Sequence, residues 1–315
     1  MEIDSVISDL YKLKKGVFSG RTRNTILGRH RSRIIGRGYR IKKISRWRRG
    51  DPFHLIDWFT TLRRHTNPKM WPNEIYKTET IEAKEVPVFL VVDTSPSMLV
   101  RFKDDDSKFI LALKAMATLG FTGMYFGDPV GIASFGQPDD IFMLPKYGKR
   151  RIITVAEVLL EGADNFYKTL RKGKLRQIVP SADINECLAE VLSRVKRQSL
   201  VVVISDFVDV LYGNVKLDED ILSGLVARHQ KNVVFLMVDD AEELSWSSGI
   251  GTVMTKNTET GRLCEVRASH AEQIRAEHAQ KQFEFQKYLE DHGIDSLVLS
   301  SNNWHDRLSE FATGR

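Results

Sequence analysis

Five continuous runs of apolar residues occupy the chain after about residue 85. They are VPVFLVVD (86–93), DPVGIASF (128–135), SLVVVISDF (199–207), NVVFLMVDD (232–240) and IDSLVLS (294–300). Each run has the length of a strand and lacks the strict alternation of a half-exposed one, which is typical of strands that are buried on both faces. We therefore expect five buried strands.

Helical periodicity fills the segments around these runs, at residues 106–127, 149–163, 181–197, 217–230 and 270–293. Strands that alternate with helices predict an α/β fold, with a doubly wound, mostly parallel sheet and helices on both faces. One interruption near 249–267 alternates around Gly261, which favours a β-hairpin insertion.

The first 85 residues follow another pattern. Residues 41–65 and 73–85 alternate in the manner of strands. Up to Pro87 there are 20 Lys and Arg against 9 Asp and Glu, and no acidic residue lies between Tyr11 and Gly50. We expect two domains: a basic, β-rich region at 1–85 and the α/β domain at 86–315.

This basic region has three interpretations. Clustered Arg and Lys bind nucleic acid by releasing counterions from phosphates, but few aromatic residues interleave with them, so nucleic acid is not favoured as a partner. The alternatives are a solvated surface and one that docks on an acidic protein.

No apolar run approaches the length of a membrane span, the acidic start does not resemble a signal peptide, and Cys187 and Cys264 form no recognisable pair. A cytoplasmic protein is expected.

Oxygen-bearing side chains follow the first apolar run in DTSPS, at residues 93–97. In an extended chain Asp93, Ser95 and Ser97 point the same way. Asp206 ends the third run, and the carboxyl ends of parallel strands meet at one edge of a sheet. Carboxylates and hydroxyls suit a hard cation such as Mg²⁺. The alternative is that the serines only satisfy turn amides or cap a helix.

These residues also carry a family resemblance. DTSPS resembles the DxSxS signature of the metal-ion-dependent adhesion site in von Willebrand factor A domains. RRGDPFHLIDWFTTLRR (48–64), followed by VFLVVDTSPSM (88–98), resembles the family called domain of unknown function 58. The similarity runs from about Arg37 to the C-terminus. It implies a von Willebrand factor A-like domain after a small β-rich region, and joint action with MoxR-type AAA+ ATPases in assembling or remodelling protein complexes.

The resemblance also implies a ligand set for Mg²⁺ or Mn²⁺. Ser95 and Ser97 would bind directly, Asp93 largely through water, and Asp206 from the outer shell. The family's second loop supplies a threonine where this chain has Ala182, so Ser181 or Asp183 would have to substitute. Asp183 is equally suited to cap the following helix.

Other charged residues have structural interpretations. The signature residues Gly50, Asp51, Asp57, Trp58 and Arg63 have no assigned chemistry. We expect them to form a buried ion pair and aromatic contact where the two regions join. KDDDSK, at 103–108, is expected to begin a helix rather than to bind a second cation.

Enzyme motifs are missing from the sequence. It contains no GxxxxGK[ST], HExxH or GxSxG string, and Ser95 replaces the second acid of a dehalogenase-like DxD. We expect a non-enzymatic interaction module whose cation binds a partner's carboxylate. The alternatives are a metal-free scaffold of the same fold and a nucleic-acid-binding accessory protein.

Overall fold

The chain forms two compact units. The computed structural model describes residues 3–18, 35–51, 53–64, 74–81, 86–99, 107–137, 140–148, 150–171, 183–230, 232–240, 252–256, 263–267 and 271–314. Residues 29–85 make up a small unit, and residues 1–28 and 86–315 make up a large unit.

A six-stranded sheet forms the centre of the large unit, and its strand order is β10-β7-β6-β3-β4-β5. Its strands are β3 (Val88–Asp93), β4 (Val130–Phe135), β5 (Phe142–Lys146), β6 (Leu200–Ser205), β7 (Val233–Asp239) and β10 (Asp295–Ser300). All neighbours pair in parallel except β4 and β5, which are antiparallel. The five predicted strands are therefore confirmed, but β10 lies at an edge and is not buried on both faces. The other edge strand, β5, was not indicated by the apolar pattern.

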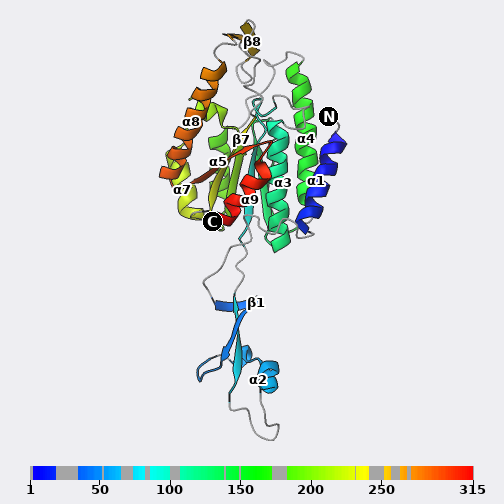
Figure 1. The fold of residues 1–315 in the computed structure, drawn as a ribbon, viewed down its shortest axis with the longest axis vertical. Coiled ribbons are helices and arrows are strands. Elements are labelled where there is room, and N and C mark those ends of the chain that lie inside the picture. The colour runs from blue at the N-terminus through cyan, green and yellow to red at the C-terminus, as the bar shows by residue number, and fades with distance from the viewer. Residues whose placement is uncertain are drawn as a thin grey trace. The chain divides into compact units, whose positions relative to one another are not determined.

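Helices cover both faces of this sheet (Figure 1). The helices of the large unit are α1 (Ile3–Phe18), α3 (Lys108–Phe126), α4 (Arg151–Arg171), α5 (Ile184–Arg194), α6 (Val208–Leu211), α7 (Glu219–His229), α8 (Ala271–Asp291) and α9 (Trp304–Gly314). Residues of α1, α3, α4 and α9 pack into one hydrophobic core, and residues of α5, α7 and α8 pack into the other. The predicted α/β fold class, with helices on both faces, is confirmed.

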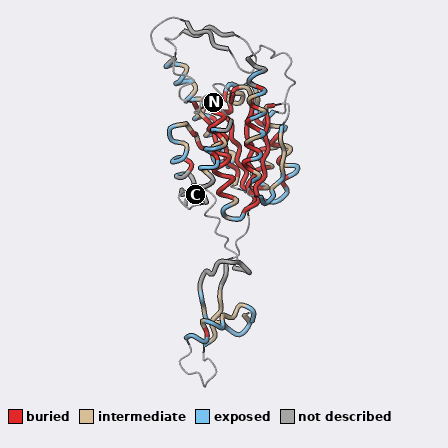
Figure 2. The backbone as a smooth tube through the Cα atoms, turned by 90° about the vertical axis from the view of Figure 1, so that its right-hand side faces the viewer, coloured by how far each residue is buried: buried red, intermediate tan, exposed pale blue. Residues whose placement is uncertain are grey.

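Strand β3 shows why its sequence is continuously apolar. Leu90 and Val92 point into one core, while Phe89 and Val91 point into the other. Every residue of β3, β4 and β6 is buried, and Figure 2 shows the buried residues concentrated in these central strands and in the helices beside them. A strand buried on both faces has no polar side, so its apolar run ends only at the edge of the sheet.

Helix α1 corrects the predicted domain division. Residues 1–28 group with the large unit, not with the small one. Val6 and Leu10, one turn apart, are buried in the core formed with α3 and α4. The predicted division relied on the basic composition of the first 85 residues. Composition does not show which side of a helix packs, so the i, i+4 apolar pair of α1 was missed.

The described residues of the small unit form an antiparallel pair of strands and two short helices. Strands β1 (Ile35–Arg46) and β2 (Tyr76–Ile81) pair, and the 3₁₀-helix η2 (Phe53–Leu55) and helix α2 (Trp58–Arg64) lie between them in sequence. The expected strand over 53–64 is therefore wrong. Asp57 accepts hydrogen bonds from the backbone N and the Oγ1 of Thr60, at 2.9 and 2.7 Å, which is an N-cap that starts a helix.

Two of the signature residues, Asp51 and Asp57, make contacts within the small unit. Asp51 pairs with Lys77 of β2 at 2.8 Å, and Asp57 also accepts from Thr78 Oγ1 at 3.3 Å. Both contacts tie the loop and α2 to β2. Within the small unit, Trp58 is 48% exposed and Arg63 is exposed, and the expected aromatic contact where the two regions join stays a prediction. Gly50, with φ of 106°, adopts the left-handed conformation of the turn before Asp51.

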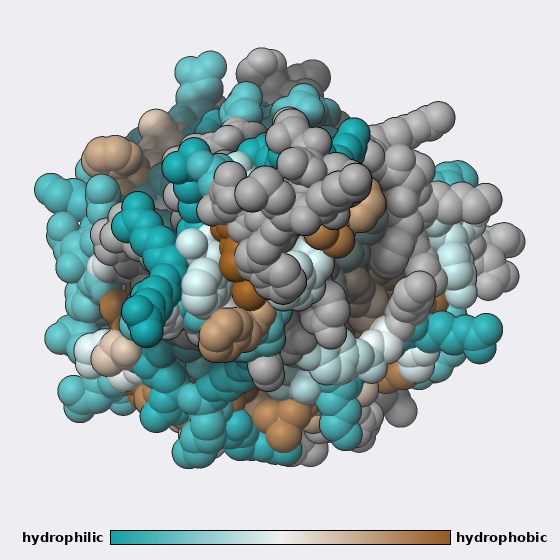
Figure 3. Space-filling view, turned by 90° about the horizontal axis from the view of Figure 1, so that it is seen from below, coloured by the Kyte–Doolittle hydropathy of each residue, from teal (hydrophilic) through white to brown (hydrophobic). Residues whose placement is uncertain are grey.

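Two further features complete the fold. Strands β8 (Thr252–Lys256) and β9 (Leu263–Arg267) form the antiparallel pair expected near 249–267, while Gly261 lies outside the described residues. The surface in Figure 3 is largely hydrophilic, with apolar side chains in small groups. Among the helices of the described residues, none combines the length and apolar character needed to span a membrane.

Candidate functional site

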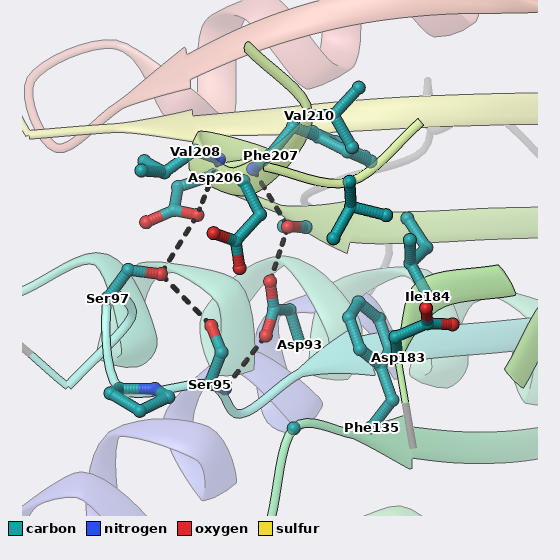
Figure 4. A pocket seen from close by; sticks show the side chains of 15 residues that line it. Asp93, Ser95, Ser97, Phe135, Asp183, Ile184, Asp206, Phe207, Val208 and Val210 are labelled. Carbon is teal, nitrogen blue, oxygen red and sulfur yellow. Dashed lines mark hydrogen bonds between the residues drawn. The ribbon is translucent and has the colours of Figure 1, made fainter. Parts of the chain in front are cut away.

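A cavity of about 200 Å³ lies at the carboxyl ends of β3 and β6 (Figure 4). The loops that follow these strands and β4 line it, together with the start of α5. The oxygen-bearing side chains of the lining are those of Asp93, Ser95, Ser97, Asp183, Ser205, Asp206 and Asp209. The sheet topology thus brings residues 93–97 beside residues 205–209, although more than 100 residues separate them in sequence.

Asp93 is held by hydrogen bonds to both carboxylate oxygens. Its Oδ1 accepts from the backbone N of Ser95 at 2.8 Å, and its Oδ2 accepts from Ser205 Oγ. Ser205 Oγ in turn accepts from the backbone N of Phe207, at 2.8 Å. This chain connects the end of β3 to the end of β6 and fixes the orientation of a carboxylate that is only 4% exposed.

The two serines connect to the second carboxylate. Ser95 Oγ and Ser97 Oγ lie 3.0 Å apart, and Ser97 Oγ donates to Asp206 Oδ1 at 3.2 Å. All three side chains are buried. The predicted alternation is therefore present: residues 95 and 97 point toward the same place, and Asp206 joins them from the neighbouring strand end.

A lysine completes the site. Lys108, the first residue of α3, donates from Nζ to Asp206 Oδ2 at 2.8 Å, and both side chains are 4% exposed. Its only sequence signal was its position in KDDDSK, where we expected a helix start. Ser107 does provide the N-cap of α3. Lys108, which follows Ser107, instead points its ammonium group toward the sheet, because its position on α3 faces the sheet.

Gly136, which follows β4, allows the loops to approach closely. Its φ is 104°, and a Cβ at this position would lie 2.6 Å from the backbone N of Ser95 and 2.8 Å from its Cα. Thr94, which lies between Asp93 and Ser95 in sequence, donates from its backbone N and from Oγ1 to the carbonyl of Phe135. The loop after β4 therefore acts as a support beneath DTSPS.

Phe207 has an unusual backbone conformation at the same edge. Its φ of 52° and ψ of 22° lie in the left-handed region, which is costly for a bulky residue. The ring is buried and stacks on Phe235, with centroids 5.2 Å apart. Aromatic packing therefore holds the turn that places Asp206 and begins α6. Backbone strain of this kind concentrates at functional sites.

The electrostatics of the site concern two neighbouring carboxylates. Burial is the main cause, and the negative charge of Asp206 the second, of a pKa of Asp93 that is raised from 3.8 to about 7. Hydrogen bonds from Ser205 and Ser95 oppose this effect. Two buried carboxylates face one buried ammonium, so the site carries an excess of negative charge when Asp93 is ionised.

The predicted ligands have different outcomes. Asp93, Ser95, Ser97 and Asp206 come together. Asp183 lines the same cavity, but its carboxylate caps α5 by accepting from the backbone N of Glu186 at 2.9 Å. Ser181 and Ala182 lie outside the described residues. Within the described part of the chain, no three His, Cys, Asp or Glu side chains gather as a metal-binding group. Any cation here would depend on the serine hydroxyls.

Two sequence comparisons bear on the identity of the chain. A family model described as "Protein of unknown function DUF58" matches residues 44–288, which include the signature residues, the DTSPS loop and Asp206. No curated protein matches the chain.

Proposed function

Because this chain belongs to the DUF58 family, whose function is unknown, we propose that it is a non-enzymatic interaction module with a metal-ion-dependent adhesion-type site. The observation that carries this proposal is the convergence of Ser95 Oγ, Ser97 Oγ and Asp206 Oδ1 beside a second carboxylate, Asp93. These oxygens border a cavity that a partner's side chain could enter.

The donor set fits Mg²⁺ or Mn²⁺. Both are hard cations that take oxygen ligands, and Mg²⁺ uses few carboxylates and keeps several waters. Ser95 and Ser97 would bind the ion directly, Asp93 would act through water, and Asp206 would act from the outer shell. When bound, the ion supplies positive charge that attracts a carboxylate from a partner. Its charge would also offset the repulsion that raises the pKa of Asp93.

The lining of the cavity supports an interaction role better than a catalytic one. Its described residues are aspartates, serines, a proline, a glycine and apolar residues, with no histidine to activate a serine. Ser95 contacts Ser97, and Ser97 donates to Asp206, a carboxylate that is already paired with Lys108. We propose that the apolar part of the lining, which includes Val210 and Val215, contacts the partner around its carboxylate.

We propose a MoxR-type AAA+ ATPase, or an acidic protein assembled with it, as the partner. Support for this identity comes from the family resemblance. The chemistry of the site adds one requirement, which is an exposed Asp or Glu on a protruding segment. Contact through a cation would be reversible, because chelation or a change in cation concentration removes the link.

Calorimetric titration with Mn²⁺ tests the site directly. Wild-type protein should bind one ion, Ser97→Ala should weaken binding about tenfold, and Asp206→Asn should weaken it further. Ser193→Ala, at an exposed serine of α5, is the matched control and should bind as wild type does. Absence of Mn²⁺ binding by the wild type at millimolar concentration would reject the metal site.

The metal-free scaffold is the second candidate, and the Lys108–Asp206 ion pair favours it. A protein ammonium already neutralises one carboxylate of the site, so the fold does not need a cation for this purpose. Binding of a purified MoxR-type ATPase in Mg²⁺ and in EDTA separates the two candidates. Equal affinity in both buffers would support the scaffold, whereas loss of binding in EDTA would support the metal-dependent contact.

A further inference from the structure

Helix α2 of the small unit packs with the opposite polarity from an ordinary amphipathic helix. Thr61 is its buried residue, and Thr61 Oγ1 accepts a hydrogen bond from the backbone N of Tyr76 at 2.9 Å. Phe59, Leu62 and Arg63 lie at i, i+3 and i+4 on the side away from Thr61. The polar residue faces β2, and the large apolar residues face outward.

The exposure of these apolar side chains is unusually high. Phe53 is 77% exposed, Phe59 74%, Leu62 61% and Trp58 48%. Single exposed apolar residues are common on protein surfaces. Here four lie within ten residues, three of them on one helix of seven residues. Phe53 packs its ring against Trp47, with centroids 5.3 Å apart, and we refer to Trp58, Phe59 and Leu62 of α2 as the apolar surface of the small unit.

The charge around this surface is positive. Arg48, Arg49 and Arg63 are exposed. The three carboxylates of the small unit whose side chains are described all have partners: Lys77 contacts Asp51, Thr60 contacts Asp57, and Arg46 contacts Glu74 at 2.7 Å. The described carboxylates therefore have partners within the unit, and Arg48 is attracted to Asp51. Arg49 and Arg63 are the exposed arginines that can attract an external anion.

We propose that the apolar surface of the small unit docks peripherally on an anionic lipid surface. Protruding rings and a leucine can enter the headgroup region without a matching pocket, and the arginines gain electrostatic attraction to anionic headgroups. A shaped protein partner would need a cavity for each protruding side chain. Nucleic acid would bind the aromatic rings by stacking and the arginines by charge. It would gain little from Leu62, because a base cannot stack on a leucine side chain. This inference does not depend on the cation site.

Co-sedimentation of the full chain with vesicles provides the test. Wild-type protein should bind vesicles made of equal amounts of phosphatidylcholine and phosphatidylglycerol, and should bind vesicles of phosphatidylcholine alone much less. Phe59→Ser and Leu62→Ser should each weaken binding to the anionic vesicles by about tenfold, because each removes a large apolar side chain. Arg63→Glu should weaken it too, and added salt should reduce the effect of charge.

Matched controls come from the large unit. Phe283→Ser removes a side chain that is 67% exposed on α8, and Arg307→Glu reverses an exposed charge on α9; both should bind vesicles as wild type does. A second readout is quenching of tryptophan emission by brominated lipid, which Trp58→Phe should reduce.

Three results would overturn the proposal. The first is absence of wild-type binding to the anionic vesicles. The second is equal loss of binding in the Phe283→Ser control and in Phe59→Ser. The third is binding of an oligonucleotide, sensitive to Arg63→Glu, by a protein that does not sediment with vesicles; this result would assign the surface to nucleic acid.

Discussion

Lys108 Nζ lies 2.8 Å from Asp206 Oδ2, and each of the two side chains is only 4% exposed. The pair joins the first residue of α3 to the residue that follows β6, so it connects the helix layer to the functional edge of the sheet. A buried pair of this kind is weak evidence for stability, but removing one partner is costly because the other charge is left buried.

Lys108→Met is therefore expected to lower the free energy of unfolding of the metal-free protein by about 3 kcal/mol. Without the ammonium, Asp206 and Asp93 repel each other more strongly, and an added cation relieves this repulsion. Mn²⁺ should consequently raise the melting temperature of Lys108→Met more than that of wild type. Thermal denaturation with and without Mn²⁺ measures both effects.

The control for Lys108→Met is Lys12→Met. Lys12 pairs with Asp9 at 2.7 Å, but these side chains are 74% and 52% exposed. Loss of this surface pair should cost less than about 1 kcal/mol. If both substitutions had the same small effect and neither changed the response to Mn²⁺, Lys108 would have no special role at the site.

Asp93 should make stability depend on pH. Its pKa in the folded protein, about 7, is above the ordinary 3.8. The folded state therefore holds a proton that the unfolded state releases, so the contribution of Asp93 is fully present below about pH 4 and is lost as the pH rises toward 7. The difference corresponds to roughly 4 kcal/mol. Asp93→Asn, which stays neutral, should remove this part of the dependence in denaturant titrations between pH 4 and 7.

The same proton opposes cation binding. Affinity for Mn²⁺ should rise with pH up to about 7, because a protonated Asp93 adds no negative charge to the site. Calorimetry at several pH values measures this, and Asp93→Asn should show weaker, nearly pH-independent binding. A wild-type affinity that stayed constant from pH 5 to 7 would contradict the raised pKa.

Gly136→Ala should displace the DTSPS loop at Ser95. The new Cβ would lie 2.6 Å from the backbone N of Ser95, and the φ of 104° is unfavourable for alanine. We expect a loss of about 2 kcal/mol in unfolding free energy, together with weaker Mn²⁺ binding. Gly213→Ala separates the two causes, since Gly213 has φ of 75° but no heavy atom within 4 Å of the added Cβ. It should cost about 1 kcal/mol and leave Mn²⁺ binding unchanged.

Asp57→Ala should loosen α2 without affecting the large unit. It removes the N-cap acceptor for Thr60, which typically costs about 1 kcal/mol. Hydrogen exchange of the α2 amides should accelerate while that of β3 does not. Hydrogen bonds from Thr60 lower the pKa of Asp57 below 3.8, so this stabilisation is present at neutral pH and is lost as the pH falls through the lowered pKa. Asp57→Asn keeps an acceptor and should restore much of the protection; exchange at the rate of Asp57→Ala would show that the cap needs the charge.

Local pattern determined five strands of the central sheet and the helices α3, α4, α5, α7 and α8, but it did not indicate α1, β5 or α9. The run from Val88 to Asp93 had to be a strand buried on both faces, because no residue between its ends is polar. The sequence also indicated that Asp93 and Asp206 end neighbouring parallel strands, so the edge where they meet could be predicted. Pattern failed where it was short or mixed: α2 was mistaken for a strand because seven residues are too few to show a helical period.

Tertiary structure decided which of the charged residues form the site. Whether Lys108 points to solvent or toward the sheet depends on how α3 packs on β3 and β6, and the residues next to it in sequence do not fix this. Likewise, the close approach of Gly136 to Ser95 arises only when β3 and β4 pair. The sequence by itself determined the ligand candidates, since alternation in an extended loop is a local property. The ion pair of Asp206 with Lys108 and the contact of Gly136 with Ser95 join residues that are distant in sequence, and only packing can bring such residues together.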